Sequence, residues 1–160
     1  MSEFTIRPAT AEDTETLVAI AIHEWKAIYD GYRDQMGEET FKVFFPDPRA
    51  DKASQIRNCV ASGNCFVTEC DGKIAGFIHY SYDPNSRTGT VGNNAVSHEF
   101  RGRGIGPRQY EFIFELLRER GALGVRVTTG LDEGHAPARR AYTKAGFAAN
   151  TQSITYYKKL

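Results

Sequence analysis

Two arginines and three alternating glycines stand together in the stretch FRGRGIG, at residues 100–106. Gly102, Gly104 and Gly106 lack a Cβ atom, so their backbone can adopt unusual dihedral angles and a ligand can approach their amides closely. Pro107, which suits the first turn of a helix, and a strongly apolar run follow directly. A buried helix beginning here would hold unpaired N–H groups and the positive end of its dipole in a fixed position. The sequence therefore predicts a cradle for a phosphate or pyrophosphate group.

Arg101 and Arg103 add positive charge to this loop. The loop does not match the dinucleotide-binding fingerprint, which needs its third glycine one place later, a strand immediately before it and an acidic residue about twenty positions on. A mononucleotide P-loop is also excluded, because the chain contains no GxxxxGK[ST]. The remaining alternative to an anion site is a tight glycine turn with two solvated arginines.

The composition is that of an ordinary globular protein. Of the 160 residues, 41% are hydrophobic and 25% are charged, which suits one domain over residues 1–160 with a single core. Twenty basic side chains balance twenty acidic ones, so a general nucleic-acid coat or an anionic-membrane binder is disfavoured. No apolar run is long enough to span a membrane and no secretory signal is visible, so we expect a cytoplasmic protein. Cys59, Cys65 and Cys70 lack metal-type pairing, so we expect reduced thiols and no bound metal.

Periodicity and turn residues predict the elements that must position the loop. Helices are expected from the Thr10/Asp13 capping box onward, at 38–45 and 49–62, from the glycine loop to Gly121, and at 135–145. Strands are expected at 4–6, 65–70, 73–82, 90–96, 124–129 and 153–159. The Asp71-Gly72 pair between two of these strands predicts a hairpin. The pattern indicates one α/β domain whose central strands form consecutive hairpins.

Three motifs in a consistent order carry a family resemblance. The RxxGxG of residues 101–106 resembles the acetyl-CoA pyrophosphate motif of the GNAT-type N-acetyltransferase superfamily, and the preceding NNAVSHEFRG is similar to that family's fourth strand and its exit. The HxxAxxxYxxxGF of residues 135–147 resembles a later motif, in which asparagine usually stands in place of His135. The opening IRPAT is also common in the family. Since the motifs extend over nearly the whole chain, it is identified as a member.

The resemblance implies an α/β (α+β) fold with a central, mixed, mostly antiparallel sheet flanked by helices. Its fourth and fifth strands would splay apart and admit the pantetheine arm of acetyl-CoA, the implied cosubstrate. By position, the backbone of Asn94, Ala95 and Val96 would pair with pantetheine and polarise the thioester carbonyl, in agreement with the need of an oxyanion for fixed donors. His135 would hydrogen-bond pantetheine, and Arg139 would reach a CoA phosphate unless it is simply solvated. The residues implied to hold the pyrophosphate are Arg101, Gly102, Arg103, Gly104, Ile105 and Gly106.

The implied activity is direct transfer of an acetyl group to an amine, with Tyr142 as the proton donor to the departing thiolate. Many relatives carry a glutamate on the fourth or fifth strand, but these strands hold no carboxylate or histidine here. An acyl-CoA sensor without turnover is therefore the alternative function. The open candidates for the base are His79, Glu24, Asp132, Glu133 and a water relay through Asn93 or Asn94.

The implied acceptor is an amine of a small molecule or a peptide. Trp25, Tyr29 and Tyr32 fall in the N-terminal helical region where the family builds its acceptor wall, and they could hold a cationic amine by cation–π contact. Core packing is the alternative role for Trp25 and Tyr29, which lie on an apolar stripe. Edge strands in the family often pair between subunits, so a homodimer is the implied assembly, with no nucleic-acid or membrane partner.

Overall fold

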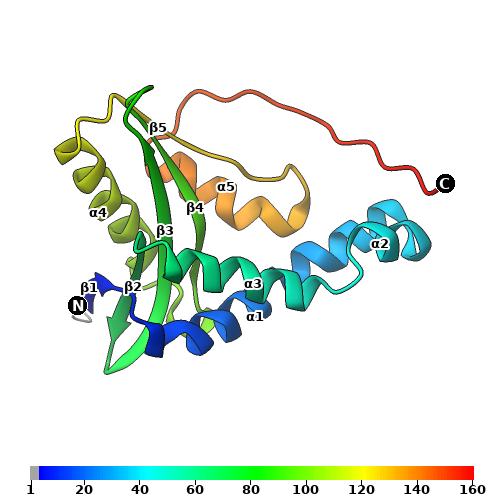
Figure 1. Ribbon diagram of the computed structural model, residues 1–160, viewed down its shortest axis with the longest axis horizontal. Helices are drawn as coiled ribbons and strands as arrows, with labels where there is room; N and C mark the ends of the chain where they lie inside the picture. Colours follow the sequence, from blue (N-terminus) through cyan, green and yellow to red (C-terminus); the bar gives the residue numbers. More distant parts are fainter. Residues whose placement is uncertain (1–3) are drawn as a thin grey trace.

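The computed structural model describes residues 4–160 and has a twisted sheet between two layers of helices (Figure 1). The strands are β1 (Phe4–Pro8), β2 (Cys65–Cys70), β3 (Lys73–Asp83), β4 (Thr88–Val96) and β5 (Gly124–Val127). The helices are α1 (Thr14–Met36), α2 (Glu38–Phe44), α3 (Pro48–Ala61), α4 (Ile105–Glu119) and α5 (Ala136–Lys144). None of these described helices combines the length and apolar character needed to cross a bilayer.

The five strands follow one another across the sheet in the order β1-β2-β3-β4-β5. The first four are antiparallel, and β5 pairs with β4 in parallel. That last pairing begins at Thr88 opposite Gly124 and ends at Val91 opposite Val127. Beyond Val91 the two strands part, while β4 continues to Val96 along β3. The expected mixed sheet with a splay between its fourth and fifth strands is thus confirmed.

The predicted hairpin between β2 and β3 is also confirmed. Asp71 and Gly72 both have positive φ, at 53° and 72°, and Cys70 pairs with Lys73 on either side of them. This is the left-handed geometry that a two-residue turn requires, and Asp-Gly is one of the pairs that adopt it most readily.

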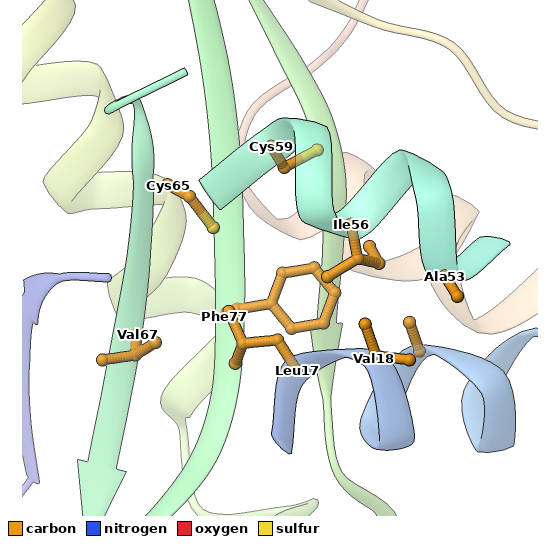
Figure 2. Close-up of a cluster of buried hydrophobic side chains, with 9 residues drawn as sticks. Leu17, Val18, Ala53, Ile56, Cys59, Cys65, Val67 and Phe77 are labelled. Atoms are coloured by element: carbon orange, nitrogen blue, oxygen red, sulfur yellow. The ribbon is translucent and has the colours of Figure 1, made fainter. Parts of the chain in front are cut away.

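The two faces of the sheet carry separate apolar clusters. Figure 2 shows Phe77 of β3 between Ile56 of α3 and Leu17 of α1, all fully buried. On the opposite face, α4 and α5 cover β3 and β4 with a second cluster: Ile78, Tyr80, Val91, Tyr110, Ile113, Leu117 and Tyr142. The apolar stripe predicted on α4 is therefore buried, which fixes the position of the helix and of its N-terminus.

The start of the first helical segment is held by one carboxylate. The side chain of Asp13 accepts from the backbone N–H of Thr10 at 2.7 Å and from two nitrogens of Arg7 at 2.8 and 3.0 Å. Arg7 also donates to Glu69 of β2, so the group ties the helix start to the sheet edge. The hydrogen bonds from Arg7 lower the pKa of Asp13 to about 2.

Asp13→Asn should lower the free energy of unfolding at pH 7 by roughly 1.5–3 kcal/mol, the usual contribution of a hydrogen bond to a charged group. Because the folded pKa lies below the unfolded value of about 3.9, this stability is present above that value and is lost as the pH falls through about 2. Urea midpoints measured from pH 6 to 2 should therefore fall more steeply for the wild type than for Asp13→Asn. Asp34→Asn, at an exposed acid of α1, is the control. Parallel slopes for wild type and Asp13→Asn would contradict the assignment.

Two expectations at the C-terminal end need correction. The predicted strand at 153–159 is wrong, since residues 147–160 form neither helix nor strand. The alternation of apolar and polar residues favoured a strand, but residues 153–159 run away from the sheet and contact α2 (Figure 1). Tyr157 packs on Phe44 with ring centroids 4.9 Å apart, and Lys159 pairs with Glu39 at 3.0 Å. The fifth strand also stops at Val127, two residues short of its predicted end.

Candidate active site

A cleft of about 510 Å³ opens where β4 and β5 part. Its walls are the second half of β4, residues 24–28 of α1, the start of α4, the segment after β5 and one face of α5. The splay exposes the β5-facing side of β4 to this space, so a bound molecule can lie along the strand as a further strand would. We call this space the cleft.

The cleft brings together residues that lie far apart in the chain. Among the residues implied to bind the coenzyme or to donate the proton, those lining it are Asn94, Ala95, Val96, Arg101, Gly106, His135 and Tyr142. The others fall outside its lining: Gly102, Arg103, Gly104, Ile105 and Arg139.

The glycine loop meets the cleft at the start of α4. Gly102 and Gly104 have φ values of 78° and 80°, which glycine adopts without strain, and no protein atom lies within 4 Å of where their side chains would begin. No side chain caps the helix, so its first amides lack the usual partner. The Ile105 side chain is 1% exposed and packs in the core, so only its backbone can face a ligand. The loop thus combines open space, free donors and the positive end of a helix dipole.

The two arginines of the loop have different surroundings. Arg101 pairs with the carboxylate of Glu24, which also accepts from the backbone N–H of His98 at 3.0 Å. Arg103 instead pairs with Asp71 at 2.9 Å in the β2–β3 turn, outside the cleft lining. Arg101 is therefore the arginine at the cleft, while Glu24, one candidate base, is already engaged by a cation and an amide.

A chain of hydrogen bonds positions the hydroxyl of Tyr142. The side-chain nitrogen of Asn94 donates to that hydroxyl at 3.3 Å, and the oxygen of the same amide accepts from Tyr110 at 2.8 Å. Because Asn94 supplies the proton of the first bond, the O–H of Tyr142 keeps its own hydrogen for a partner in the cleft. Burial raises the pKa of Tyr142, which is 9% exposed, so the hydroxyl is protonated at neutral pH.

Tyr110 was not singled out in the sequence, where it counted only as part of an apolar stripe. A buried tyrosine hydroxyl usually needs a hydrogen-bond partner, and that was the signal available. The partner could not be read from the sequence, because Asn94 lies on a different element.

Lys52 of α3 is a second residue that sequence reasoning missed. It is only 4% exposed; its ammonium group donates to the Asn93 side chain at 3.1 Å and lies 4.3 Å from the centre of the Trp25 ring. Burial lowers the pKa of Lys52 to about 8. One face of Trp25 is thus already covered by a cation.

Of the three aromatic residues expected in the acceptor wall, only Trp25 lines the cleft; Tyr29 and Tyr32 pack around Phe45.

His135 is joined to Asp132 on the α1 side of the cleft. Its Nδ1 lies 2.6 Å from a carboxylate oxygen of Asp132, and the two side chains are 13% and 12% exposed. Burial alone would raise the pKa of Asp132, but the hydrogen bond and the charge of His135, together with backbone hydrogen bonds, outweigh burial and the pKa is lowered. The guanidinium of Arg139 donates to the backbone carbonyls of Gly130 and Asp132, both at 2.7 Å, and so shapes the loop that carries the pair.

The other candidate bases are less well placed. His79 on β3 packs against Gly92, and burial lowers its pKa. Glu133 is exposed to solvent. Neither side chain contributes to the lining of the cleft.

Comparisons with known proteins agree with this geometry. The model of the Acetyltransferase (GNAT) family matches residues 25–147. A streptothricin acetyltransferase of Streptomyces lavendulae is 34% identical over 110 residues, which are 67% of this chain and 56% of that protein, so the chain spans little more than half of this relative.

Two solved structures share the fold. The PaiA N-acetyltransferase of Thermoplasma acidophilum, in complex with coenzyme A, superposes with a TM-score of 0.71 at 18% identity, covering 97% of this chain and 96% of that one. An aminoglycoside acetyltransferase from an uncultured soil metagenomic sample, in complex with sisomicin, gives 0.61 at 16% identity, with coverages of 98% and 96%. At these identities the likeness establishes the fold.

Proposed function

Because the chain belongs to the GNAT acetyltransferase family, we propose that it transfers an acetyl group from acetyl-CoA to an amine. The observation that carries the proposal is the hydroxyl of Tyr142, which is protonated and held by Asn94, on a residue that lines the cleft between the parted strands. A protein that only bound acyl-CoA would have no need of a positioned proton donor there.

Acetyl-CoA, which would supply the activated acetyl group, suits the residues of the cleft. The free edge of β4 at Asn94, Ala95 and Val96 offers backbone groups to the pantetheine arm. The uncapped amides of Ile105 and Gly106 and the open space at the loop glycines suit the pyrophosphate.

Arg101→Ala should weaken CoA binding about tenfold, as expected for the loss of one charge-assisted hydrogen bond of about 1.5 kcal/mol. The loss should shrink at high salt, because Arg101 is exposed to solvent. Arg103→Ala is the matched control: Arg103 is bound to Asp71, and we expect less than a threefold change. Calorimetric titration with CoA at two ionic strengths measures both. A larger loss for Arg103→Ala would reverse the two assignments.

In the reaction, the amine nitrogen forms a bond to the acetyl carbon and the carbon–sulfur bond breaks. The sulfur must gain a proton and the acceptor, an ammonium ion at neutral pH, must lose its protons. We assign the first transfer to the O–H of Tyr142. The backbone of Asn94–Val96 would stabilise charge on the carbonyl oxygen, because fixed donors need no reorganisation as the charge develops.

We propose a small-molecule amine as the acceptor. Support comes from the relative named as acting on streptothricin and from the solved relative that holds sisomicin. Thiol release from acetyl-CoA, measured across streptothricin, aminoglycosides, polyamines, amino acids and peptide N-termini, tests the activity and the acceptor together. Release with peptides alone would reject the acceptor class. Tight CoA binding without release for any amine would favour the sensor.

Three expectations concern the molecule as a whole. We propose a reducing, cytoplasmic compartment, which the free and buried thiols of Cys59, Cys65 and Cys70 favour. A single domain over residues 1–160 and assembly as a homodimer stay predictions. Limited proteolysis tests the first of these, and sedimentation equilibrium tests the second.

A further inference from the structure

The proposed reaction needs a group that takes a proton from the acceptor ammonium. The carboxylate of Glu24 is engaged by Arg101 and by the amide of His98, and His79 and Glu133 do not line the cleft. His135 does line it, and imidazole is the side-chain type that most often acts as a general acid or base in enzymes.

The contact with Asp132 determines which nitrogen of the His135 ring carries the proton in the neutral form. With Nδ1 bound to the carboxylate at 2.6 Å, the neutral ring carries its proton on Nδ1, and Nε2 is left with a free lone pair. Nε2 lies on the opposite edge of the ring from Asp132. A ring that is 13% exposed and held on one edge by a carboxylate has little freedom to rotate, and the residue lines the cleft.

The charged and titratable groups around the ring come from three elements. Asp132, in the preceding loop, is hydrogen-bonded to Nδ1 of the ring at 2.6 Å. Tyr32 of α1 lies across from the ring at a centroid distance of 6.1 Å, and burial raises its pKa, so it is neutral. The guanidinium of Arg139 of α5 donates to the backbone carbonyls of Gly130 and Asp132. Asp132 is thus the charged group in direct contact with the ring.

The position of the pair matches the acceptor half of the cleft. Gly134, next to His135, packs against Ile28 of α1, and all three residues line the cleft. The glycine loop and α4, which suit the pyrophosphate, bound another part of the cleft. A cationic amine entering beside α1 would therefore meet the ring before it reached the thioester.

We propose that His135, oriented by Asp132, is the general base of this enzyme. The lone pair of Nε2 takes one proton from the acceptor ammonium, which gives an imidazolium ion paired with the Asp132 carboxylate and a neutral amine. The nitrogen lone pair of that amine then attacks the acetyl carbon, the carbon–sulfur bond breaks as Tyr142 protonates the sulfur, and the second proton lost by the nitrogen restores the Tyr142 hydroxyl. The inference rests on the proposed acetyl transfer and gives Asp132 a positioning role.

The experiment compares His135→Asn and Asp132→Asn with the wild type, using an acceptor amine from the panel and its fluorinated analogue, which is largely unprotonated at the assay pH. Asparagine keeps a hydrogen-bonding group at position 135 but cannot take a proton. We expect kcat/KM for the ordinary amine to fall about 10²-fold at pH 7 in His135→Asn, and the loss to shrink at high pH and with the fluorinated amine. Asp132→Asn should also lower kcat/KM at pH 7, by a smaller factor, and this loss should likewise shrink at high pH. Asp34→Asn, at an exposed acid of α1, is the control for Asp132→Asn and should leave the pH profile unchanged.

Two further measurements separate the outcomes. The affinity for CoA should stay within about threefold of the wild type in His135→Asn. Added imidazole should restore part of the activity of His135→Ala. The alanine variant also provides a test of the base if His135→Asn folds poorly. An equal loss for both amines without rescue, or a loss of CoA affinity that matches the loss of rate, would overturn the base and make His135 a pantetheine ligand. A wild type that acetylates no amine would instead reject the proposed function and this inference with it.

Discussion

Replacing Tyr142 with phenylalanine should lower kcat by about 10²–10⁴-fold, the range in which a positioned proton donor contributes. The ring packs in the cluster under α4 and α5, so Tyr142→Phe keeps the packing and removes only the hydroxyl. The affinity for acetyl-CoA should change little, because the hydroxyl matters chiefly when charge develops on the sulfur. Steady-state rates with an accepted amine, a calorimetric titration with CoA and a melting scan on both proteins measure the three quantities.

Tyr110→Phe is the matched control for this experiment. It removes the neighbouring hydroxyl, which donates to Asn94 at 2.8 Å and so supports the amide that holds Tyr142. We expect a loss of less than tenfold, since the proton donor itself remains. If Tyr142→Phe keeps the full kcat, Tyr142 is not the proton donor. If the variant loses CoA affinity as much as it loses rate, Tyr142 contributes to binding and not to proton transfer.

Gly106→Val should weaken CoA binding by about 10²-fold, which corresponds to roughly two charge-assisted hydrogen bonds of about 1.5 kcal/mol each. Gly106 lies in the first turn of α4 and lines the cleft, and the nearest atom to a side chain there would be a methyl carbon of Val96 at 4.0 Å. A valine therefore meets little resistance from the protein but occupies the space that the pyrophosphate would use. Gly106, unlike Gly102 and Gly104, does not have a positive φ, so backbone strain does not complicate the result.

The control for Gly106→Val is Gly124→Val at the start of β5. No protein atom lies within 4 Å of where the Gly124 side chain would begin, and the residue is outside the cleft. Both variants should melt within a few degrees of the wild type, and Gly124→Val should bind CoA normally. Unchanged CoA affinity in a folded Gly106→Val protein would remove the glycine loop from the binding site.

Local patterns predicted the parts of the fold that local physics decides. The spacing of apolar residues located α4, the Asp71-Gly72 pair located the hairpin, and the glycine motif located an uncapped helix start. The strand predicted at 153–159 is wrong because strand formation also depends on contacts outside the segment. Alternation shows that a segment can form a strand, but a strand also needs a neighbour, and these residues contact α2 instead.

The candidate site was predictable where a motif defines a position and not where two distant side chains meet. Tyr142 falls at a motif position and lines the cleft. The pairing of Glu24 with Arg101 joins residues 77 apart in sequence, and that of Lys52 with Asn93 joins residues 41 apart. Such contacts depend on how helices pack over the sheet, and nothing in the chain near either residue signals them.

The ion pair between Glu24 and Arg101 has a consequence for the speed of the catalytic cycle. A pyrophosphate that binds Arg101 must compete with the carboxylate of Glu24, whose side chain is only 7% exposed and lies in the cleft wall. The same carboxylate is in place to recapture the arginine when the coenzyme begins to leave. We therefore expect the pair to shorten the residence time of spent CoA, so that product dissociation is faster and the enzyme is freed sooner for the next turnover.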